Sequence, residues 1–264
     1  MLTPIRRRDA RAAAEPDPNG TKLLEQAHDL NRREPLALAL LGLELDGLKS
    51  DTDLVAAVLA SAAPDGRAAR AAVNLATDFL HADAEVCSST LWDVAVTTSK
   101  NFEPGGEIAT LLFSRGVHAI LAHRVAHALW KAGRRDLSLA LKTVFSRTFS
   151  TDIHPGAVFG AGVWLDHGVG FVVGETAVIG VNVNIWHGVT LGGTLKQAGE
   201  GRHPRLRDGC TIGAGAIILG GVEIGEASVV AAGSIVLSDV PPGVTVAGAP
   251  ARPKARTAAS FSGF

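Results

Sequence analysis

A six-residue hydrophobic repeat runs through the second half of the chain. Aliphatic or aromatic residues recur every six positions over 153–171, resume after two extra residues over 179–191, and restart over 212–236. Glycine or another small residue often follows one place later. A period of six fits neither a helix nor a simple strand, but it fits a chain that makes one flat side of a triangular coil per hexad. The repeat therefore predicts a parallel β-helix whose recurrent apolar residues point inward.

The two halves of the 264-residue sequence differ in composition. The first 150 residues are rich in alanine, leucine, aspartate and arginine, whereas 151–250 is rich in glycine, valine and isoleucine. Helix formers followed by β formers predict an α+β protein, with an α-helical domain at 21–150 and the β-helix at 151–250. A charged, proline-containing leader at 1–20 is expected to be disordered, and 251–264 is expected to be a loose C-terminal tail.

Leucine and alanine at helical spacing predict several helices in the first half. Two are expected within 21–49, broken near Pro35, and a loop is expected at 100–106. The other expected helices lie at 51–61, opened by an Asp51 cap, and at 65–81, 84–98, 108–130 and 136–149.

Charge and cysteine content narrow the classes of function. The net charge is −1 with acids and bases interspersed, which predicts no broad field for nucleic acid or an anionic membrane. Cys87 and Cys210 offer neither a metal spacing nor a disulfide framework, so a cytoplasmic location is expected. The arginines at 6–8 precede no apolar core of a signal peptide, and no run reaches membrane-spanning length.

Two further features admit a functional and a structural interpretation. A basic, glycine-rich segment at 192–211 interrupts the repeat, and such insertions often carry function, although a solvated excursion is the alternative. His123 and His127 are four residues apart on an expected helix, a spacing that allows both to bind one metal. No third ligand is evident in the sequence, so packing is favoured and no metal is expected.

His167 and His187 occupy the same place in their hexads, which puts them one coil, or about 4.8 Å, apart along the axis. Isoleucine or leucine fills the inward position of each hexad, so both imidazoles are expected to point outward. An outward histidine is either an acid-base group or an ordinary surface residue, and the residues alone leave both interpretations open.

Several short motifs accompany the repeat. They are Asp152–Pro155, Leu165–Gly168, Gly174–Ala177, Val189–Thr194, Arg202–Pro204 and Ile212–Ala216, with Gly116–Ala119 and Gly133–Arg135 in the helical part. Together they resemble the serine O-acetyltransferases of the hexapeptide-repeat acyltransferases over about residues 111–252. The resemblance implies a left-handed β-helix, although chain connectivity alone favours right-handed crossovers.

The resemblance also implies roles for individual residues. His167 is implied as the general base, with Asp152 orienting its ring, and Asp166 as the group that faces the acceptor's ammonium. Arg202 and His203 are implied to hold the acceptor's carboxylate. From the residues alone, Asp152 reaches His167 only if the chain bends at the first coil, Asp166 could cap a corner, and Arg202 could contact only solvent.

Acetyl-CoA is the implied cosubstrate, bound in a groove between protomers, with no permanently bound cofactor. Small residues let the pantetheine arm approach the backbone closely. The matching positions are Gly193, Thr194, Ala214 and Ala232, with Lys196 or Arg252 available for the phosphates.

L-Serine is the implied acceptor, in the entry step of cysteine synthesis. The family has an Arg-Asp-Pro segment whose aspartate helps to hold the serine ammonium of a neighbouring subunit. This sequence has Asn101 at that aspartate, and Glu103 could supply the carboxylate after a two-residue shift. Another small hydroxy or amino acceptor is therefore one alternative, and a non-catalytic trimeric scaffold is another.

The resemblance further implies a homo-oligomer, either a trimer through the β-helices or a dimer of trimers through the helical domains. Feedback inhibition by cysteine is a family property that the sequence leaves open. Cysteine synthase also stays an open partner, because the family's docking tail ends in isoleucine whereas this sequence ends in Phe264.

Overall fold

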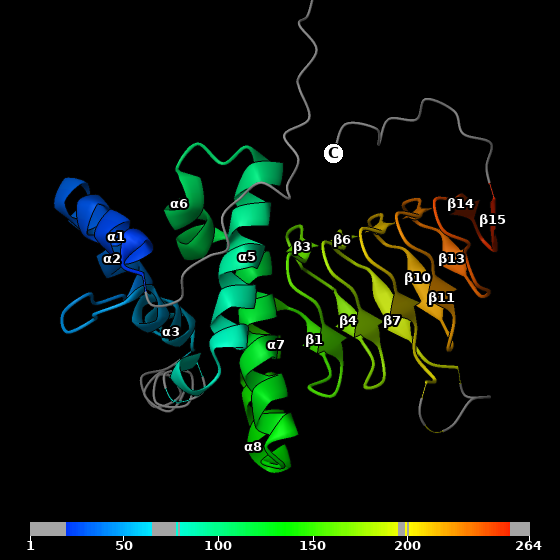
Figure 1. The fold of residues 1–264 in the computed structure, drawn as a ribbon, viewed down its shortest axis with the longest axis horizontal. Coiled ribbons are helices and arrows are strands. Elements are labelled where there is room, and N and C mark those ends of the chain that lie inside the picture. Colours follow the sequence, from blue (N-terminus) through cyan, green and yellow to red (C-terminus); the bar gives the residue numbers. More distant parts are fainter. Residues whose placement is uncertain (1–19, 65–77, 79, 195–198, 200, 254–264) are drawn as a thin grey trace, which may run out of the picture.

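The computed structural model describes residues 20–64, 78, 80–194, 199 and 201–253. The expected leader up to residue 19, most of the helix expected at 65–81, and the tail from 254 lie outside these residues. The first residues of the expected tail, Ala251–Pro253, instead form a strand, because they pair with the preceding strand of the coil. Figure 1 shows the helices at one end of the molecule and the strands stacked into a long coil at the other. Helices followed by a β-helix confirm the predicted α+β fold class.

The described helices all precede the coil. They are α1 (Lys22–Arg33), α2 (Pro35–Leu41), α3 (Asp51–Ser61), α5 (Ala84–Asn101), α6 (Gly106–Phe113), α7 (Arg115–Lys131) and α8 (Arg135–Phe149). As predicted, the first two are separated at Pro35. In the part of the chain that the structure describes, no helix is long and apolar enough to cross a membrane.

Three details of the helical part differ from the sequence-based expectation. The helix expected at 108–130 is two helices, because Ser114 is extended and its hydroxyl accepts a hydrogen bond from the Val117 amide, which starts α7. Ser50, rather than Asp51, caps α3, in a capping box with Asp53. Helix α5 continues through Asn101, where a loop was expected.

Short strands make up the coil. They are β1 (Asp152–Ile153), β2 (Val158–Phe159), β3 (Trp164–Leu165), β4 (Val172–Val173), β5 (Val178–Ile179), β6 (Asn184–Ile185), β7 (Thr190–Gly192), β8 (Arg205–Leu206), β9 (Thr211–Ile212), β10 (Ile217–Leu219), β11 (Glu223–Ile224), β12 (Val229–Val230), β13 (Ile235–Val236), β14 (Thr245–Gly248) and β15 (Ala251–Pro253).

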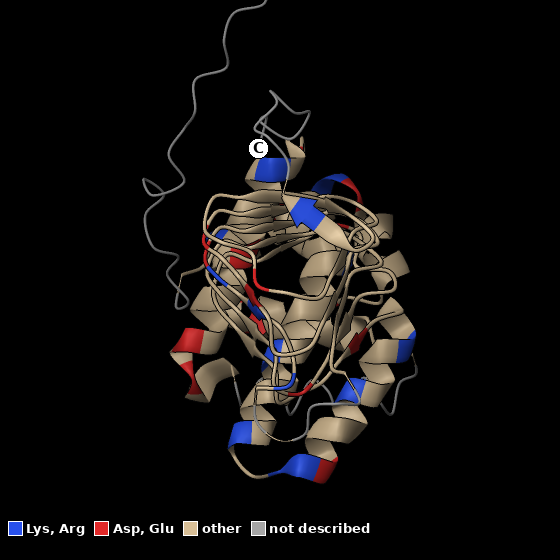
Figure 2. Ribbon diagram, turned by 90° about the vertical axis from the view of Figure 1, so that its right-hand side faces the viewer, with Lys and Arg blue, Asp and Glu red and all other residues tan. Residues whose placement is uncertain are grey.

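Three sheets form the faces of the triangular coil, in the orders β1-β4-β7-β10-β13, β2-β5-β8-β11 and β3-β6-β9-β12-β14-β15. Every pair is parallel except β14 with β15. Aligned apolar residues such as Ile185, Ile212 and Val230 stack coil on coil and are fully buried. Seen end-on in Figure 2, the coils superimpose, and acidic and basic positions are interspersed around them.

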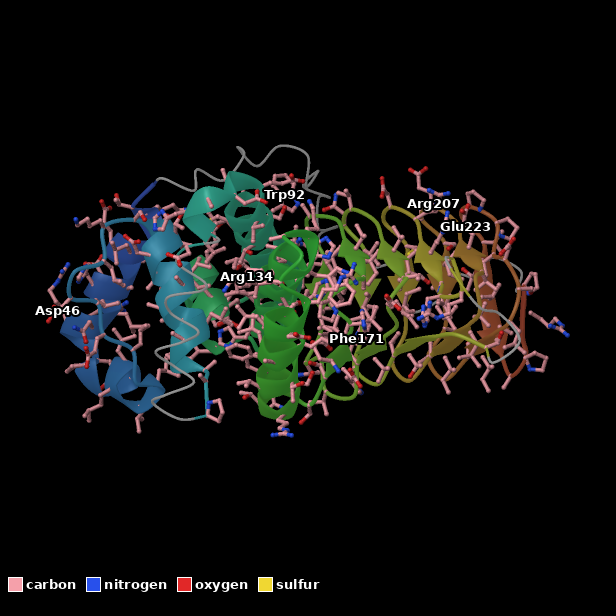
Figure 3. The ribbon with its side chains drawn as sticks, turned by 90° about the horizontal axis from the view of Figure 1, so that it is seen from below. Asp46, Trp92, Arg134, Phe171, Arg207 and Glu223 are labelled. Atoms are coloured by element: carbon pink, nitrogen blue, oxygen red, sulfur yellow. The ribbon has the colours of Figure 1, made fainter. Side chains whose placement is uncertain are left out.

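The two extra residues of the repeat lie at a different place from the one that the sequence indicated. Ile153 pairs with Val173, twenty residues on (173 − 153), whereas Val173 pairs with Leu191 after eighteen (191 − 173). The extra residues therefore lie between Leu165 and Val173, not after Phe171. Phe171 is itself buried, within the coil in Figure 3, so its hydrophobicity misled the count. The corner that this insertion enlarges carries His167.

The second interruption is shorter than the expected loop at 192–211. Leu206 is already buried in register with Ile179 and Ile224, so the coil resumes at β8 rather than at Ile212. The excursion is confined to the segment between β7 and β8. Of this segment, 195–198 and 200 lie outside the described residues.

A buried ion pair joins the helices to the coil. The Asp93 carboxylate of α5 contacts the Arg124 guanidinium of α7 at 2.8 Å and accepts a hydrogen bond from the Val163 amide at 2.8 Å. Arg124 also donates to the Gly160 carbonyl at 2.7 Å. Removing either charge leaves the other buried without its partner, so this pair holds two helices and the first coil in fixed relation.

Candidate active site

His167 lies on the enlarged corner between β3 and β4. Its side chain is 71% exposed, so the ring points outward as the repeat predicted. The backbone φ is +58°, a conformation that non-glycine residues adopt rarely and at a cost. The Gly168 amide donates to the Asp166 carbonyl at 2.7 Å and closes a tight turn around the histidine. The imidazole is thus presented to solvent on a strained turn.

Two titratable side chains, Asp166 and His187, lie next to the His167 ring within the described residues. The Asp166 carboxylate is 3.5 Å from Nε2. The His187 ring lies with its centroid 5.8 Å away in an edge-on arrangement, which confirms that these histidines are one coil apart. The carboxylate and the second imidazole lie on neighbouring parts of the same corner.

Asp152, predicted to orient His167, lies elsewhere in the protomer. It pairs in register with Val172 on β4, five residues past His167 (172 − 167), and its carboxylate forms an ion pair with Lys142 of α8. Among the described residues it makes no contact with His167. Its side chain is 62% exposed. The Asp152–His167 pair therefore remains a prediction, and it requires contact between protomers or a shift of the side chain.

A cleft of about 480 Å³ opens beside His167. Its lining residues come from the end of α5, from α6, from the start of α7 and from the corner. They are Asn101, Glu103, Ala109, Thr110, Phe113, Ser114, Arg115, Leu165, Asp166, His167 and Val169. The cleft brings together four of the predicted site residues within one protomer. The family pattern had suggested that Asn101 and Glu103 act on a neighbouring subunit.

Close packing of α7 on the coil forms one wall of this cleft. A Cβ added to Gly116 would lie 1.8 Å from the Leu165 carbonyl oxygen, so only glycine lets the helix come this near. The approach carries Phe113 and Arg115 to the cleft, two residues that sequence reasoning missed. The Gly116–Ala119 motif was the available signal, but its meaning depended on a contact between distant segments.

A hydrogen bond from Trp164 fixes the orientation of the Asn101 side chain. The Trp164 indole N–H donates to its Oδ1 at 3.1 Å, so this oxygen is already engaged. The Asn101 amide nitrogen has no partner among the described residues. The cleft therefore carries an amide donor at the position where the family pattern has a carboxylate, together with the carboxylates of Glu103 and Asp166.

Arg202 and His203 lie together on the coil face that contains β4. They contact the corner that follows β4, whereas His167 lies on the corner that precedes it. The Arg202 guanidinium contacts the Glu175 carboxylate at 2.7 Å. The Nδ1 atom of His203 accepts from the Thr176 amide at 3.1 Å, and burial lowers the pKa of His203, so the neutral ring carries its proton on Nε2. The two residues present fixed donors suited to a carboxylate, but they do not line the cleft beside His167.

The predicted coenzyme A positions divide between two corners. Register places Ala214 and Ala232 two residues after β9 and β12, as His167 and His187 follow β3 and β6. These four residues form one column, here called the corner column. Gly193 lies against His203 at the other end of the face, where an added Cβ would be 3.3 Å from its ring, and Thr194 follows it. Lys196 lies outside the described residues, and Arg252 is exposed on β15.

Comparisons with known proteins fit this arrangement. The bacterial transferase hexapeptide (six repeats) family matches residues 203–238. A serine acetyltransferase of Neisseria gonorrhoeae solved with serine is 38% identical, with a TM-score of 0.81, over 90% of this chain and 97% of that chain. This chain belongs to the serine acetyltransferase family. A further family member, from Brucella abortus strain S19 in complex with coenzyme A, is 40% identical, with a TM-score of 0.82, over 90% of this chain and 95% of that one.

Curated serine acetyltransferases match over a shorter stretch. The Escherichia coli (strain K12) enzyme is 47% identical over 171 residues, which is 65% of this chain but 62% of that enzyme. The chain therefore matches less than two thirds of the length of this relative.

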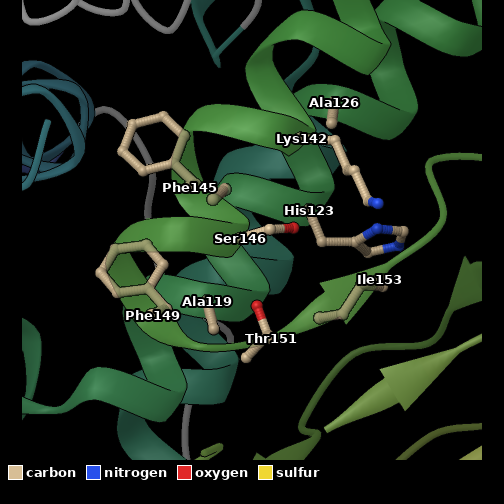
Figure 4. A pocket seen from close by; sticks show the side chains of 10 residues that line it. Ala119, His123, Ala126, Lys142, Phe145, Ser146, Phe149, Thr151 and Ile153 are labelled. Atoms are coloured by element: carbon tan, nitrogen blue, oxygen red, sulfur yellow. The ribbon is translucent and has the colours of Figure 1, made fainter. Parts of the chain in front are cut away.

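Two histidines of α7 in this serine acetyltransferase family member, His123 and His127, pack against the coil and do not line the cleft beside His167. His123 is 4% exposed, its ring contacts Phe159, and burial holds its pKa well below the ordinary value. Figure 4 shows it beside a cavity of about 20 Å³ with Lys142 and Ser146. His127 instead hydrogen-bonds the Pro155 carbonyl at 2.7 Å. Within the described chain no three histidine, cysteine or acidic side chains are grouped to hold a metal.

Proposed function

We propose that this chain is a cytoplasmic acetyl-CoA:L-serine O-acetyltransferase that catalyses the entry step of cysteine biosynthesis. The observation that carries the proposal is the position of His167, which lines the cleft and also begins the corner column. Solved relatives bind serine or coenzyme A, and this supports serine as acceptor and acetyl-CoA as donor. The column's small residues, Ala214 and Ala232, leave room for a pantetheine arm.

The chemistry requires one proton transfer at each end of the reaction. The serine oxygen attacks the thioester carbonyl carbon while His167 removes the hydroxyl proton, so a C–O bond forms. The C–S bond then breaks, its electron pair leaves with sulfur, and protonation of the sulfur gives the free thiol of CoA. A well-placed base contributes about 10²–10⁴-fold to such a step. The Glu103 and Asp166 carboxylates would hold the serine ammonium.

A homotrimer would bring the two halves of the site together. His167 and Glu175 mark opposite corners of one face, on the order of 20 Å apart at the strand rise per residue. A cyclic trimer has heterologous interfaces, in which one edge of a protomer meets a different edge of the next. The neighbour's Arg202 and His203 would then hold the serine carboxylate, and its Gly193 and Thr194 would close the coenzyme A groove. The exposed Val169 gives this edge an apolar contact.

A thiol-release assay tests the activity. Purified protein with acetyl-CoA is expected to release CoA only when L-serine is present, and His167→Ala is expected to lower kcat by about 10²–10⁴-fold. His28→Ala, on α1 away from the cleft, is the matched control and should keep full activity. The absence of serine-dependent release, or an active His167→Ala variant, would contradict the proposal.

Asn101 supports one alternative within the same chemistry. Because its amide replaces a carboxylate, another small hydroxy or amino acceptor is the alternative substrate. A panel of such acceptors, compared with serine, separates the two. Serine should give the highest kcat/KM of the panel. A higher value for another acceptor would transfer the assignment to that compound while keeping His167 and coenzyme A.

A further inference from the structure

The second histidine of the corner column, His187, takes no part in the chemistry proposed for His167. His187 lies one coil beyond His167, with Ala214 and Ala232 on the following coils. Backbone hydrogen bonds join these successive coils, from the Gly188 amide to Val169 and from the Gly215 amide to His187. The cleft lined by His167 does not include His187. His167 therefore separates the acceptor cleft from the rest of the column, and His187 is the first side chain on the donor side.

The His187 imidazole is free to bind a ligand. It is exposed, and among the described residues its one side-chain contact is the edge-on ring of His167, with centroids 5.8 Å apart. The charged or titratable groups near it are His167 and, beyond that ring, Asp166. No described side chain accepts a hydrogen bond from this ring, so its N–H is available to a ligand that lies beside His167.

The direction of the acyl donor follows from this order and from the proposed function, on which the inference rests. The carbonyl carbon of the thioester has to lie at His167, where the acceptor oxygen arrives from the cleft. The pantetheine arm has to run along the small residues Ala214 and Ala232. The thioester sulfur joins these two parts, so it lies beside the one residue between them, His187.

We propose that His187 is a catalytic residue that donates a hydrogen bond to the thioester sulfur as the C–S bond breaks. The electron pair of that bond moves to sulfur, and the His187 N–H stabilises the developing thiolate. The proton that His167 removes from the acceptor hydroxyl is finally transferred to the sulfur, which gives the neutral thiol of CoA. A hydrogen bond to a charged sulfur is stronger than one to a neutral sulfur, so the contact favours the transition state over the bound thioester.

The column offers a well-matched substitution. Alanine occupies the equivalent corner position in the next two coils, at Ala214 and Ala232, so His187→Ala is compatible with the fold. His187→Gln keeps an N–H donor of similar reach. His28→Ala again serves as the control for loss of an unrelated histidine.

Two readouts test the role of His187. His187→Ala should lower kcat about 10- to 100-fold with little change in KM for the acceptor, and His187→Gln should recover part of the loss. The pKa of the CoA thiol, followed by its thiolate absorbance in the binary complex, should lie below that of CoA free in solution when the wild-type protein is used. It should rise toward that value in His187→Ala.

The outcomes separate this inference from the proposed function. If wild-type protein releases CoA with serine, but His187→Ala changes neither kcat nor the pKa of the bound thiol, the role of His187 is overturned and the acetyltransferase assignment stands. If wild-type protein binds no CoA and releases none, the proposed function itself fails. A fall in kcat without any change in the thiol pKa would also contradict a hydrogen bond to sulfur.

Discussion

At the scale of the residue, Asn101 is the position where this chain departs most clearly from the family pattern. Trp164 holds its Oδ1, and the amide nitrogen is the group left for a ligand. A carboxylate at this position would have one oxygen for the indole and one for an ammonium. The same cleft already contains the carboxylates of Glu103 and Asp166 together with the Arg115 guanidinium.

Asn101→Asp is therefore expected to lower KM for serine by roughly five- to tenfold, because a charged hydrogen bond replaces a neutral group. The value of kcat should change little, since the substitution acts on binding and not on the base. Steady-state kinetics with varied serine measure this. Glu103→Gln, which removes a carboxylate from the same cleft, should raise KM, and an unchanged KM in both variants would show that the ammonium binds elsewhere.

At the scale of the element, the repeat was predictable and its irregularities were not. The period of six gave the coil, its inward positions and the outward direction of His167, because these depend on spacing alone. The two-residue insertion was placed one hexad too late, after Phe171 instead of between Leu165 and Val173, since the buried Phe171 is apolar like the residues of the true register. The break at Ser114 was missed because the apolar pattern continues through it.

Contacts between segments distant in the sequence explain why the arrangement of the site residues was not predicted. Asn101 and Asp166 line one cleft because Gly116 lets α7 touch the coil at Leu165, a contact between segments about fifty residues apart (165 − 116). The separation of His167 from Arg202 likewise depends on the coil register. The sequence motifs supplied four of the residues that line the cleft. They could not show which of the predicted site residues lie together in one protomer.

The junction between helices and coil gives a stability prediction. Burial raises the pKa of Asp93 to about 6, and Arg124 is the main opposing influence. Arg124→Met should lower the free energy of unfolding by about 3–5 kcal/mol near pH 8, because the buried carboxylate loses its cation. In the unfolded chain Asp93 ionises near pH 3.9, whereas in the folded variant it stays protonated to about pH 6 or above, so rising pH favours the unfolded state.

The loss should accordingly be smaller near pH 5 than near pH 8, which urea unfolding at the two values measures. Arg207→Met is the matched control, since Arg207 forms an exposed ion pair with Glu223 on the coil (Figure 3). It should change stability little at either pH. An equal loss at both pH values for Arg124→Met would contradict the proposal that protonation of Asp93 offsets the loss of Arg124 near pH 5.

At the scale of the whole molecule, the predicted site residues fall into two groups at opposite edges of one face. Asn101, Glu103, Asp166 and His167 belong to one edge, and Arg202 and His203 belong to the other. The residues predicted to bind the acceptor's carboxylate, Arg202 and His203, do not line the cleft that holds the residues predicted to bind its ammonium. The proposed mechanism therefore requires a second copy of the chain to complete each site, so activity would be a property of the oligomer.

Activity of mixed trimers tests this claim most directly. His167→Ala and Arg202→Ala chains carrying different tags are expressed together, and trimers that contain both are purified by the two tags in sequence. Each variant alone should be inactive, whereas any mixed trimer contains about one site in three with both groups intact, and should recover about a third of wild-type activity. Mixed trimers as inactive as the separate variants would contradict a site shared between protomers.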